Sequence, residues 1–330
     1  MKSDSLYQEL TSVIRERVPH KELVTMLSDL LIIEKEAIYR RLRGEVPFTF
    51  AEVAKISKKL NLSLDTIIGT TSENNKPFQL KLMNHANYGE DDFKIFDKFI
   101  ELIKCAGSSK YSEFGFATSV LPLHSSCCYE ALERFYILRW LYQFGQPGNT
   151  TPFKSIVLSE RKKSFNKQFN EEVQNVKYTY FVWDRLTLFY LINDMHYFRK
   201  IHLLDDEDMV VLKNEIDLFV NDIEKIAIKG SYPNGNKIEI YISNISFETT
   251  YTYLKADDFN ITFIKTFTLN ETVSTDDTVY QKMKLWIDTL KRTSTLISGS
   301  NEIYRIQFFE KQRELIDAMF SKDFKPDELW

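Results

Sequence analysis

Glycine and proline are scarce in this chain, which has only 10 Gly and 8 Pro among its 330 residues. Collagenous and low-complexity chains contain far more of both, and disordered chains are poorer in apolar residues than the 43% found here, so these classes are excluded. Few Gly and Pro residues also favour helices over tight turns. Because a single core stops growing near ~250 residues, the length predicts about two domains. We expect a folded, helix-rich protein.

Long apolar runs and cysteine pairs are also missing. No stretch approaches the ~18 uninterrupted apolar residues of a membrane-spanning helix, and the first residues, MKSDSLYQEL, carry charge where a signal peptide would be apolar. The three cysteines, Cys105, Cys127 and Cys128, are odd in number and lack CxxC spacing, which favours a reducing compartment. These absences predict a cytoplasmic protein with no membrane partner.

Motifs of common catalytic and metal sites are absent. The chain has no GxSxG, GxxxxGK[ST], HExxH or GxGxxG sequence, and its five histidines lack metal-ligand spacing. Cys127 and Cys128 follow His124, but no orienting acid lies nearby in the sequence. The acidic run from Asp205 to Asp208 is typical of a helix amino terminus. We therefore expect no catalytic residue, no metal and no cofactor, although catalytic residues far apart in sequence would escape this search.

The negative charge is unevenly distributed along the chain. The formal net charge is −4, yet residues 1–70 contain 11 Lys and Arg against 10 Asp and Glu, a net of +1. From Lys35 to Lys59, seven basic residues stand against three acidic ones. A local excess of this size is compatible with phosphate contacts and also with an ordinary solvated helix surface.

Five short helices are predicted in the first seventy residues. Apolar residues recur there at helical spacing, Gly44 suits a left-handed helix end, and Thr49 with Glu52 forms a T-x-x-E capping-box sequence. Ser63 is expected to cap the last helix. The expected helices cover residues 4–18, 20–31, 34–43, 50–60 and a short segment from 64 to 68. A tight turn between the second and third helices makes this arrangement typical of a helix-turn-helix domain.

The segment LSDLLIIEKEAIYRRLRGE (residues 27–45), followed by FTFAEVAKISKKLNLSLDTIIG (residues 48–69), resembles the XRE/Cro-type helix-turn-helix family of DNA-binding regulators. Two positions depart from the family pattern: Ile32 replaces the usual turn Gly, and Glu34 replaces the usual Ser cap. The resemblance implies a transcriptional regulator that binds double-stranded DNA with its third helix, residues 34–43, in the major groove. The matching residues are Leu27, Ser28, Leu31, Ile33, Ile38, Arg43, Gly44 and the NLSLD segment.

Helical geometry independently assigns the faces of the third helix. With Ile38 taken as pointing inward, Leu42 lies about 40° away, whereas Arg41 lies about 60° away and is expected to pack along a neighbouring helix or to reach a phosphate. Long donors on the outer face can read guanine, and a carboxylate can accept from cytosine. The candidate DNA-binding residues are Lys35, Glu36, Tyr39, Arg40 and Arg43.

The polar segment GTTSENNKP, residues 69–77, marks a domain boundary. We therefore divide the chain into a DNA-binding domain (1–70), a linker (71–77) and a second domain (78–330). Strands are expected in the second domain at 78–82, 113–123, 178–183, 237–243, 246–254 and 260–267, and helices at 91–105, 129–144, 160–173, 186–203, 206–228, 278–291 and 302–320. The last three strands should form an antiparallel meander, followed by a polar loop, 270–277, in which Ser274 and Asp277 are candidate caps.

The predicted fold is mainly α with α+β: a five-helix helix-turn-helix domain and a larger α+β domain that contains the meander. One recognition helix reads only a few base pairs, so specificity normally requires two half-sites held by a homodimer. Aromatic residues are dense in the second domain, which fits a packed core, a ligand pocket or a dimer interface.

We therefore expect a sequence-specific transcriptional regulator whose second domain serves dimerisation, sensing of a small-molecule or peptide effector, or both. Two alternatives stay open: a protein-interaction module that binds no DNA, and an enzyme that uses the helix-turn-helix domain for targeting.

Overall fold

The computed structural model describes residues 3–60, 62, 64–67, 76–122, 126–145, 151–321 and 324. The chain divides into two compact units, residues 1–77 and 78–330, each with a hydrophobic core of its own. Of the expected linker only residues 76–77 are described. Ser63 and His124 also lie outside the described residues.

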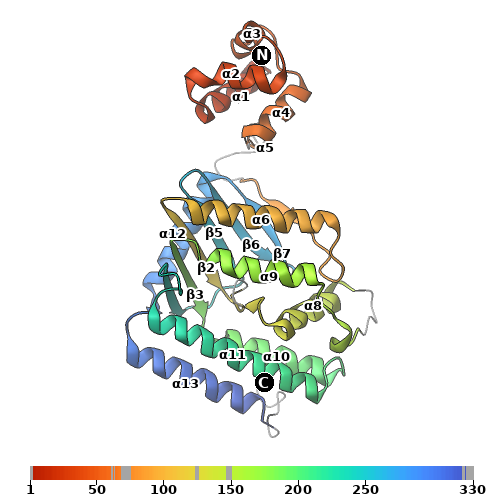
Figure 1. Ribbon diagram of the computed structural model, residues 1–330, viewed down its shortest axis with the longest axis vertical. Coiled ribbons are helices and arrows are strands. Elements are labelled where there is room, and N and C mark those ends of the chain that lie inside the picture. The colour runs from red at the N-terminus through yellow and green to blue at the C-terminus, as the bar shows by residue number, and fades with distance from the viewer. Residues whose placement is uncertain are drawn as a thin grey trace. The chain divides into compact units, whose positions relative to one another are not determined.

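The first unit consists of short helices around a small core (Figure 1), and the five predicted helices are confirmed. They are α1 (Ser3–Arg17), α2 (His20–Leu31), α3 (Lys35–Leu42), α4 (Phe50–Leu60) and α5 (Leu64–Ile67). Each helix contributes apolar side chains from one face, as the spacing predicted. The buried core residues are Leu10, Ile14, Leu23, Leu27, Leu31, Ile38, Leu42, Phe48, Ile56 and Ile67.

The second unit is built on an eight-stranded mixed sheet of order β1-β7-β6-β5-β2-β3-β4-β8. The neighbouring strands β2, β3 and β4 are parallel, and β5, β6 and β7 form an antiparallel meander beside them. The strands are β1 (Gln79–Lys81), β2 (Ser112–Thr118), β3 (Tyr178–Asp184), β4 (Lys237–Ser243), β5 (Tyr251–Ala256), β6 (Asn260–Thr266), β7 (Asn270–Ser274) and β8 (Ser294–Leu296). The predicted α+β class is confirmed.

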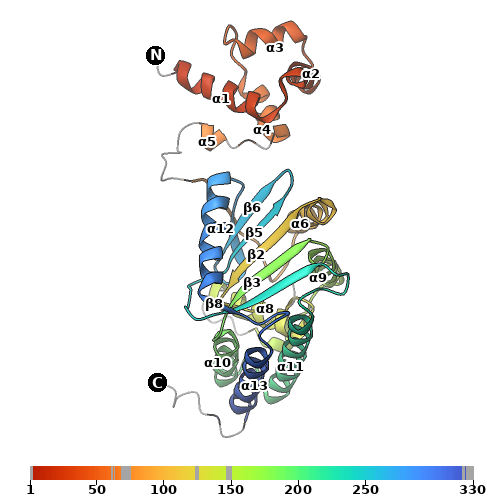
Figure 2. The ribbon, with the colours of Figure 1, turned by 90° about the vertical axis from the view of Figure 1, so that its left-hand side faces the viewer.

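Helices cover both faces of this sheet (Figure 2). Alternate residues of β3 belong to different cores: Phe181 and Trp183 pack in the large core, whereas Tyr180 and Val182 pack beneath α12. The helices are α6 (Glu90–Ser108), α8 (Glu130–Phe144), α9 (Glu160–Val173), α10 (Thr187–Lys200), α11 (Asp206–Lys229), α12 (Asp277–Arg292) and α13 (Glu302–Met319), with a 3-10 turn, η1 (Phe153–Ser155). None of the described helices is both long and apolar enough to cross a membrane.

Two details of the predicted meander are wrong. The segment 237–243, expected as its first strand, is β4, which pairs in parallel with β3 because α10 and α11 carry the chain back across the sheet. The third strand is instead β7, in the segment 270–277 that was expected to be a loop. Alternation of Ile238, Ile240 and Ile242 specifies the buried face of a strand but not its neighbour, so the pattern suited either pairing.

Helix caps follow the sequence closely, with one correction. The predicted capping box of α4 is confirmed: Thr49 N–H donates to Glu52 at 2.7 Å, and Glu52 N–H donates to Thr49 Oγ1 at 3.3 Å. The acidic start of α11 also forms a capping box, between Asp205 and Asp208. The cap of α12 is Asp276, not Ser274 or Asp277, because its side chain accepts a hydrogen bond from Val279 N–H.

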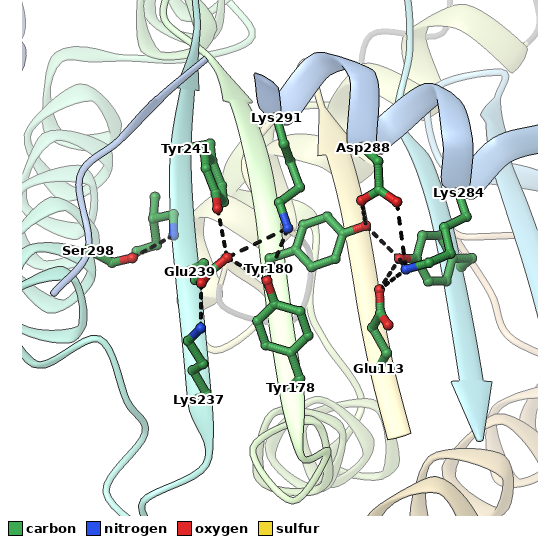
Figure 3. Close-up of polar contacts among 12 residues, drawn as sticks. Glu113, Tyr178, Tyr180, Lys237, Glu239, Tyr241, Lys284, Asp288, Lys291 and Ser298 are labelled. Carbon is green, nitrogen blue, oxygen red and sulfur yellow. Dashed lines mark hydrogen bonds and ion pairs between the residues drawn. The ribbon is translucent and has the colours of Figure 1, made fainter. Parts of the chain in front are cut away.

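A polar layer joins α12 to the sheet, centred on Glu113 of β2 (Figure 3). The Glu113 carboxylate accepts hydrogen bonds from Tyr253 and from Lys284 of α12, and Lys284 Nζ also donates to Tyr253 Oη at 3.0 Å. Burial raises the pKa of the Glu113 carboxyl. The hydrogen bonds from Lys284, Tyr111 and Tyr253 outweigh this effect and lower that pKa overall. The charges of this layer are therefore internally satisfied.

A matching group lies on β3 and β4, centred on Glu239 (Figure 3). Tyr241 Oη donates to Glu239 at 2.7 Å, Tyr178 donates to it as well, and Lys291 of α12 lies 3.6 Å from its carboxylate. Burial raises the pKa of the Glu239 carboxyl, yet hydrogen bonds from Lys237 and both tyrosines lower it to about 2. Two carboxylates in the sheet and two lysines of α12 thus fix this helix in place.

Candidate nucleic-acid interface

Helix α3 is positioned by two buried side chains, Ile38 and Leu42, which lie in the core of the first unit. The opposite surface of this helix faces solvent. All five predicted DNA-binding residues are exposed on it: Lys35, Glu36, Tyr39, Arg40 and Arg43. The structure therefore brings these residues together on one accessible surface, which we call the α3 surface.

Arg41 is separated from the α3 surface and pairs with Glu52 of α4. Its Nε and Nη2 donate to the two Glu52 oxygens at 3.2 and 2.9 Å, a bidentate arrangement with both side chains mostly buried. Burial raises the pKa of the Glu52 carboxyl, but the hydrogen bonds from Thr49 and Arg41 lower it overall. Of the two roles expected for Arg41, the structure shows packing along the neighbouring helix.

The carboxyl end of α3 is closed by a Schellman motif. Gly44 adopts φ 79°, its N–H donates to the Arg41 carbonyl at 2.9 Å, and Glu45 N–H donates to the Arg40 carbonyl at 3.0 Å. The reversal brings the Glu45 side chain back to the last turn of α3. The predicted left-handed cap at Gly44 is confirmed.

Glu45 forms ion pairs with two of the candidate DNA-binding arginines. Its carboxylate lies 2.6 Å from Arg43 Nε and 3.5 Å from Arg40 Nε, and Arg43 Nη2 also lies 3.5 Å from Glu36. The hydrogen bond from Arg43 is the main cause that lowers the pKa of the Glu45 carboxyl. Sequence reasoning missed this role, although the position of Glu45 directly after Gly44 was the available signal.

Helix α1 also positions α3, and no sequence pattern indicated it. Tyr7 Oη donates to the Arg41 carbonyl at 2.9 Å, and Arg15 Nη2 donates to the Leu42 carbonyl at 2.9 Å. These donors satisfy carbonyls that a helix end otherwise leaves unpaired. Three neighbours, α1, α2 and α4, therefore contact α3, which holds its exposed side chains on a rigid support.

The amino end of α3 differs from that of a helix with a Ser cap. Glu34 occupies the cap position with φ −64° and ψ 149°, and its side chain makes no capping hydrogen bond. Ile32, in the preceding turn, adopts the left-handed conformation with φ 58° and ψ 48°, which the family pattern assigns to Gly. Both departures thus keep the turn geometry while changing the chemistry at the helix start.

Two histidines of the second unit, His85 and His196, have structural partners. His196 lies 2.7 Å from the Met319 carbonyl, and His85 contacts Asn270 and Tyr88. Across the described part of the chain, no three His, Cys, Asp or Glu side chains are grouped so that they could hold a metal ion.

Comparison with known families identifies the first unit. Residues 5–100 match the family model of the BetR domain, a helix-turn-helix-type DNA-binding domain. The match continues beyond the first unit through β1 into the first half of α6, and it covers less than half of the chain. Neither the search of curated proteins nor that of solved structures found a match. The chain thus carries an amino-terminal helix-turn-helix domain of a DNA-binding regulatory class.

Proposed function

We propose that this protein is a cytoplasmic, sequence-specific transcriptional regulator of the XRE/Cro type, without catalytic activity, that inserts α3 into the major groove of double-stranded DNA. The observation that carries the proposal is the α3 surface. Its five polar side chains are exposed, whereas Ile38 and Leu42 on the opposite side of the helix are buried. The BetR-domain match supports DNA binding by this unit.

The chemistry of the α3 surface suits base reading. Arg40 and Arg43 can donate to guanine O6 and N7, and Glu36 can accept from cytosine N4. In the free protein Glu45 already binds both arginines, so DNA must displace its carboxylate. DNA binding then exchanges the Glu45 carboxylate for acceptor atoms of the DNA. This exchange favours DNA sites that offer two acceptors at the positions of Arg40 and Arg43.

We also propose that the protein acts as a homodimer and that the second unit provides dimerisation, effector sensing or both. An eight-residue recognition helix covers only a few base pairs. Two such helices on half-sites about one helical turn apart give the specificity that a regulator needs. An isologous dimer imposes an inverted repeat on the DNA site.

The test starts with selection of random duplexes by the full chain, followed by affinity measurements on the selected site. We expect an inverted repeat, and Arg40→Ala or Arg43→Ala should weaken binding by about 1–3 kcal/mol, since each removes a base contact. Arg292→Ala on α12 removes the same charge from the second unit and should leave affinity unchanged. Hydrogen exchange of the amides of α3 verifies that the variants are folded.

Three results would contradict the proposal. Selection that enriches no sequence would favour the protein-interaction module. Wild-type affinity that is equal at 50 and 200 mM salt would exclude phosphate neutralisation, because counterion release makes such binding steeply salt-dependent. Unchanged affinity in both arginine variants would show that the α3 surface is not the reading surface.

A further inference from the structure

Two adjoining cavities lie in the second unit, between the sheet and helices α6 and α9, which cover this face (Figures 1 and 2). One of about 90 Å³ is bounded by β2, β5, β6 and β7, and one of about 110 Å³ by α6, α8 and α9. Both are lined by residues of the large core and by side chains packed against it. Their common wall consists of Phe99, Phe169, Leu269, Asn270 and Glu271.

The walls of these cavities are rich in aromatic residues. Phe114 and Phe116 of β2 and Phe263 of β6 line the sheet side, and Phe99 and Phe169 line the helix side. A void of ~150 Å³ holds one benzene ring, and each of the two spaces is smaller than that. A six-carbon ligand would therefore have to extend through both. Apolar walls with a few polar groups are the usual composition of a small-molecule site.

The charged groups that line the two cavities do not balance. Three lysines, Lys81, Lys162 and Lys265, stand against two carboxylates, Glu133 and Glu271, a net of +1. Lys162 is satisfied, because its Nζ lies 2.7 Å from Glu133 and both side chains are buried. The excess positive charge therefore lies among the remaining groups, where one bound anion would neutralise it.

Lys265 has no carboxylate partner within ion-pair distance among the residues that the structure describes. Its Nζ lies 5.4 Å from the ring centre of Tyr136 and forms no hydrogen bond or ion pair with any residue that the structure describes. Glu271 is its neighbour in the β6–β7 register, yet the two side chains form no ion pair within 4.0 Å. Burial lowers the pKa of the Lys265 ammonium to about 8 and raises that of the Glu271 carboxyl. A half-buried ammonium without a carboxylate partner is costly and favours a bound anion.

We infer that these cavities bind a compact apolar monocarboxylate, with its carboxylate on the Lys265 ammonium and its hydrocarbon part against Phe99, Phe116, Phe169 and Phe263. A carboxylate can accept a charge-assisted hydrogen bond from Lys265. The inference names a class of effector for the sensing role proposed for the second unit. Ligand binding can be tested without DNA, and only the effect of the ligand on DNA binding rests on the proposed function.

A larger cleft of about 460 Å³ adjoins the second cavity. It is bounded by residues 85–88, by the segment 155–159 and by α8 and α9, and it shares His85, Tyr88 and Lys162 with the second cavity. His85 Nε2–H donates to Asn270 Oδ1 at 3.1 Å, and Tyr88 Oη–H donates to His85 Nδ1 at 3.0 Å. These two side chains thus border both the cleft and the second cavity.

The experiment compares three probes of equal length on the full chain by titration calorimetry: hexanoate, 1-hexanol and hexylamine. We expect hexanoate to bind at least about tenfold more tightly than hexanol, since a hydrogen bond to a charged group is worth that factor, and hexylamine to bind weakest. Lys265→Met should lose the preference for hexanoate and retain hexanol binding, which reports an intact cavity. Lys282→Met, on the exposed side of α12, should bind all three probes as the wild type does.

Other outcomes overturn the inference. Absence of heat with all three probes at millimolar concentration would show that the cavities are ordinary packing defects. Equal hexanoate affinity in Lys265→Met, or tighter binding of hexylamine, would exclude Lys265 as the anchor. A separate titration of the selected DNA, with and without hexanoate, distinguishes the two proposals. If the protein binds no DNA even without hexanoate, the proposed regulator is refuted. If hexanoate binds but the affinity for DNA does not change, sensing of this class of ligand is refuted.

Discussion

Glu45 holds the two arginines that we assign to DNA. Its carboxylate lies between the Arg40 and Arg43 side chains, all three about half exposed. Ion pairs at such positions contribute little to folding, because water screens them. Their effect on DNA binding is larger, since the same carboxylate repels phosphate and must be displaced before the arginines can reach a base.

Glu45→Gln should therefore strengthen DNA binding about threefold, because it removes one negative charge next to the reading arginines. Glu9→Gln, on the exposed side of α1, removes the same net charge from the unit and serves as the matched control. Fluorescence anisotropy with the selected duplex measures both affinities. A weaker complex in Glu45→Gln, or an equal gain in Glu9→Gln, would contradict this role.

Ile32 shows how a single residue tolerates an unfavourable conformation. Its side chain is 85% exposed, so it gains little from burial, and its left-handed φ of 58° costs about 1–2 kcal/mol relative to an allowed region. The turn persists because Ile32 N–H donates to the Ser28 carbonyl at 2.9 Å and Ser28 Oγ donates to the Ile33 carbonyl at 2.6 Å. One backbone and one side-chain hydrogen bond thus hold a turn that has no glycine.

At the scale of elements, Gly115 of β2 leaves room for the tyrosines that lie between the sheet and α12. Gly115 lies at the centre of β2, where a Cβ atom would stand 2.7 Å from the Tyr253 ring and 2.9 Å from the Tyr180 ring. The absence of a side chain allows both tyrosines to lie over the strand and to reach Asp288 and Glu113. The polar layer beneath α12 therefore depends on glycine at this position.

Gly115→Ala should destabilise the second unit by about 1–3 kcal/mol, the usual cost of overpacking a filled core. Urea unfolding followed by near-ultraviolet circular dichroism reports the loss through the tyrosines. Gly89→Ala is the control for a glycine with open space around it, because a Cβ there meets only Asp92 Oδ2 at 3.8 Å. Gly89 is the N-cap of α6, where Ala is less favourable than Gly, so this variant should lose no more than about 1 kcal/mol. A neutral Gly115→Ala would mean that the tyrosines can shift without cost.

At the scale of the whole molecule, the two units contain charged groups that respond to different conditions, salt in the first unit and pH in the second. The α3 surface of the first unit uses arginines, which stay charged at every relevant pH and respond to salt. The second unit contains His85, a buried histidine whose pKa is lowered to about 4, chiefly by burial. DNA binding should thus vary with ionic strength, and the stability of the second unit with pH.

The sign of the pH effect follows from linkage. Between pH 4 and 6.5 the unfolded chain protonates His85 and the folded chain does not, so stability rises with pH in this window and is lost as pH falls. At pH 5 the loss from His85 should reach up to about 2 kcal/mol. Urea unfolding at pH 7 and pH 5 measures it, and His85→Gln should show a smaller loss. Equal losses in both proteins would show that other groups dominate.

Local sequence signals predicted much of the first unit. The capping box of Thr49 and Glu52, the left-handed Gly44 and the inward positions of Ile38 and Leu42 are all observed, because caps and amphipathic faces depend on residues within a few positions of one another. The exposure of Arg40 and Arg43 follows from the same periodicity. Their pairing with Glu45 required the three-dimensional turn after α3.

Composition, spacing and local hydrogen bonding were enough to predict the helix-turn-helix domain and the α+β class. The pairing of β4 with β3, the completion of the meander by β7 and the place of Lys265 beside a cavity lined by phenylalanines became known only from the three-dimensional structure. Strand neighbours and cavity walls join residues far apart in the chain, and alternation encodes which face is buried but not which strand lies beside it.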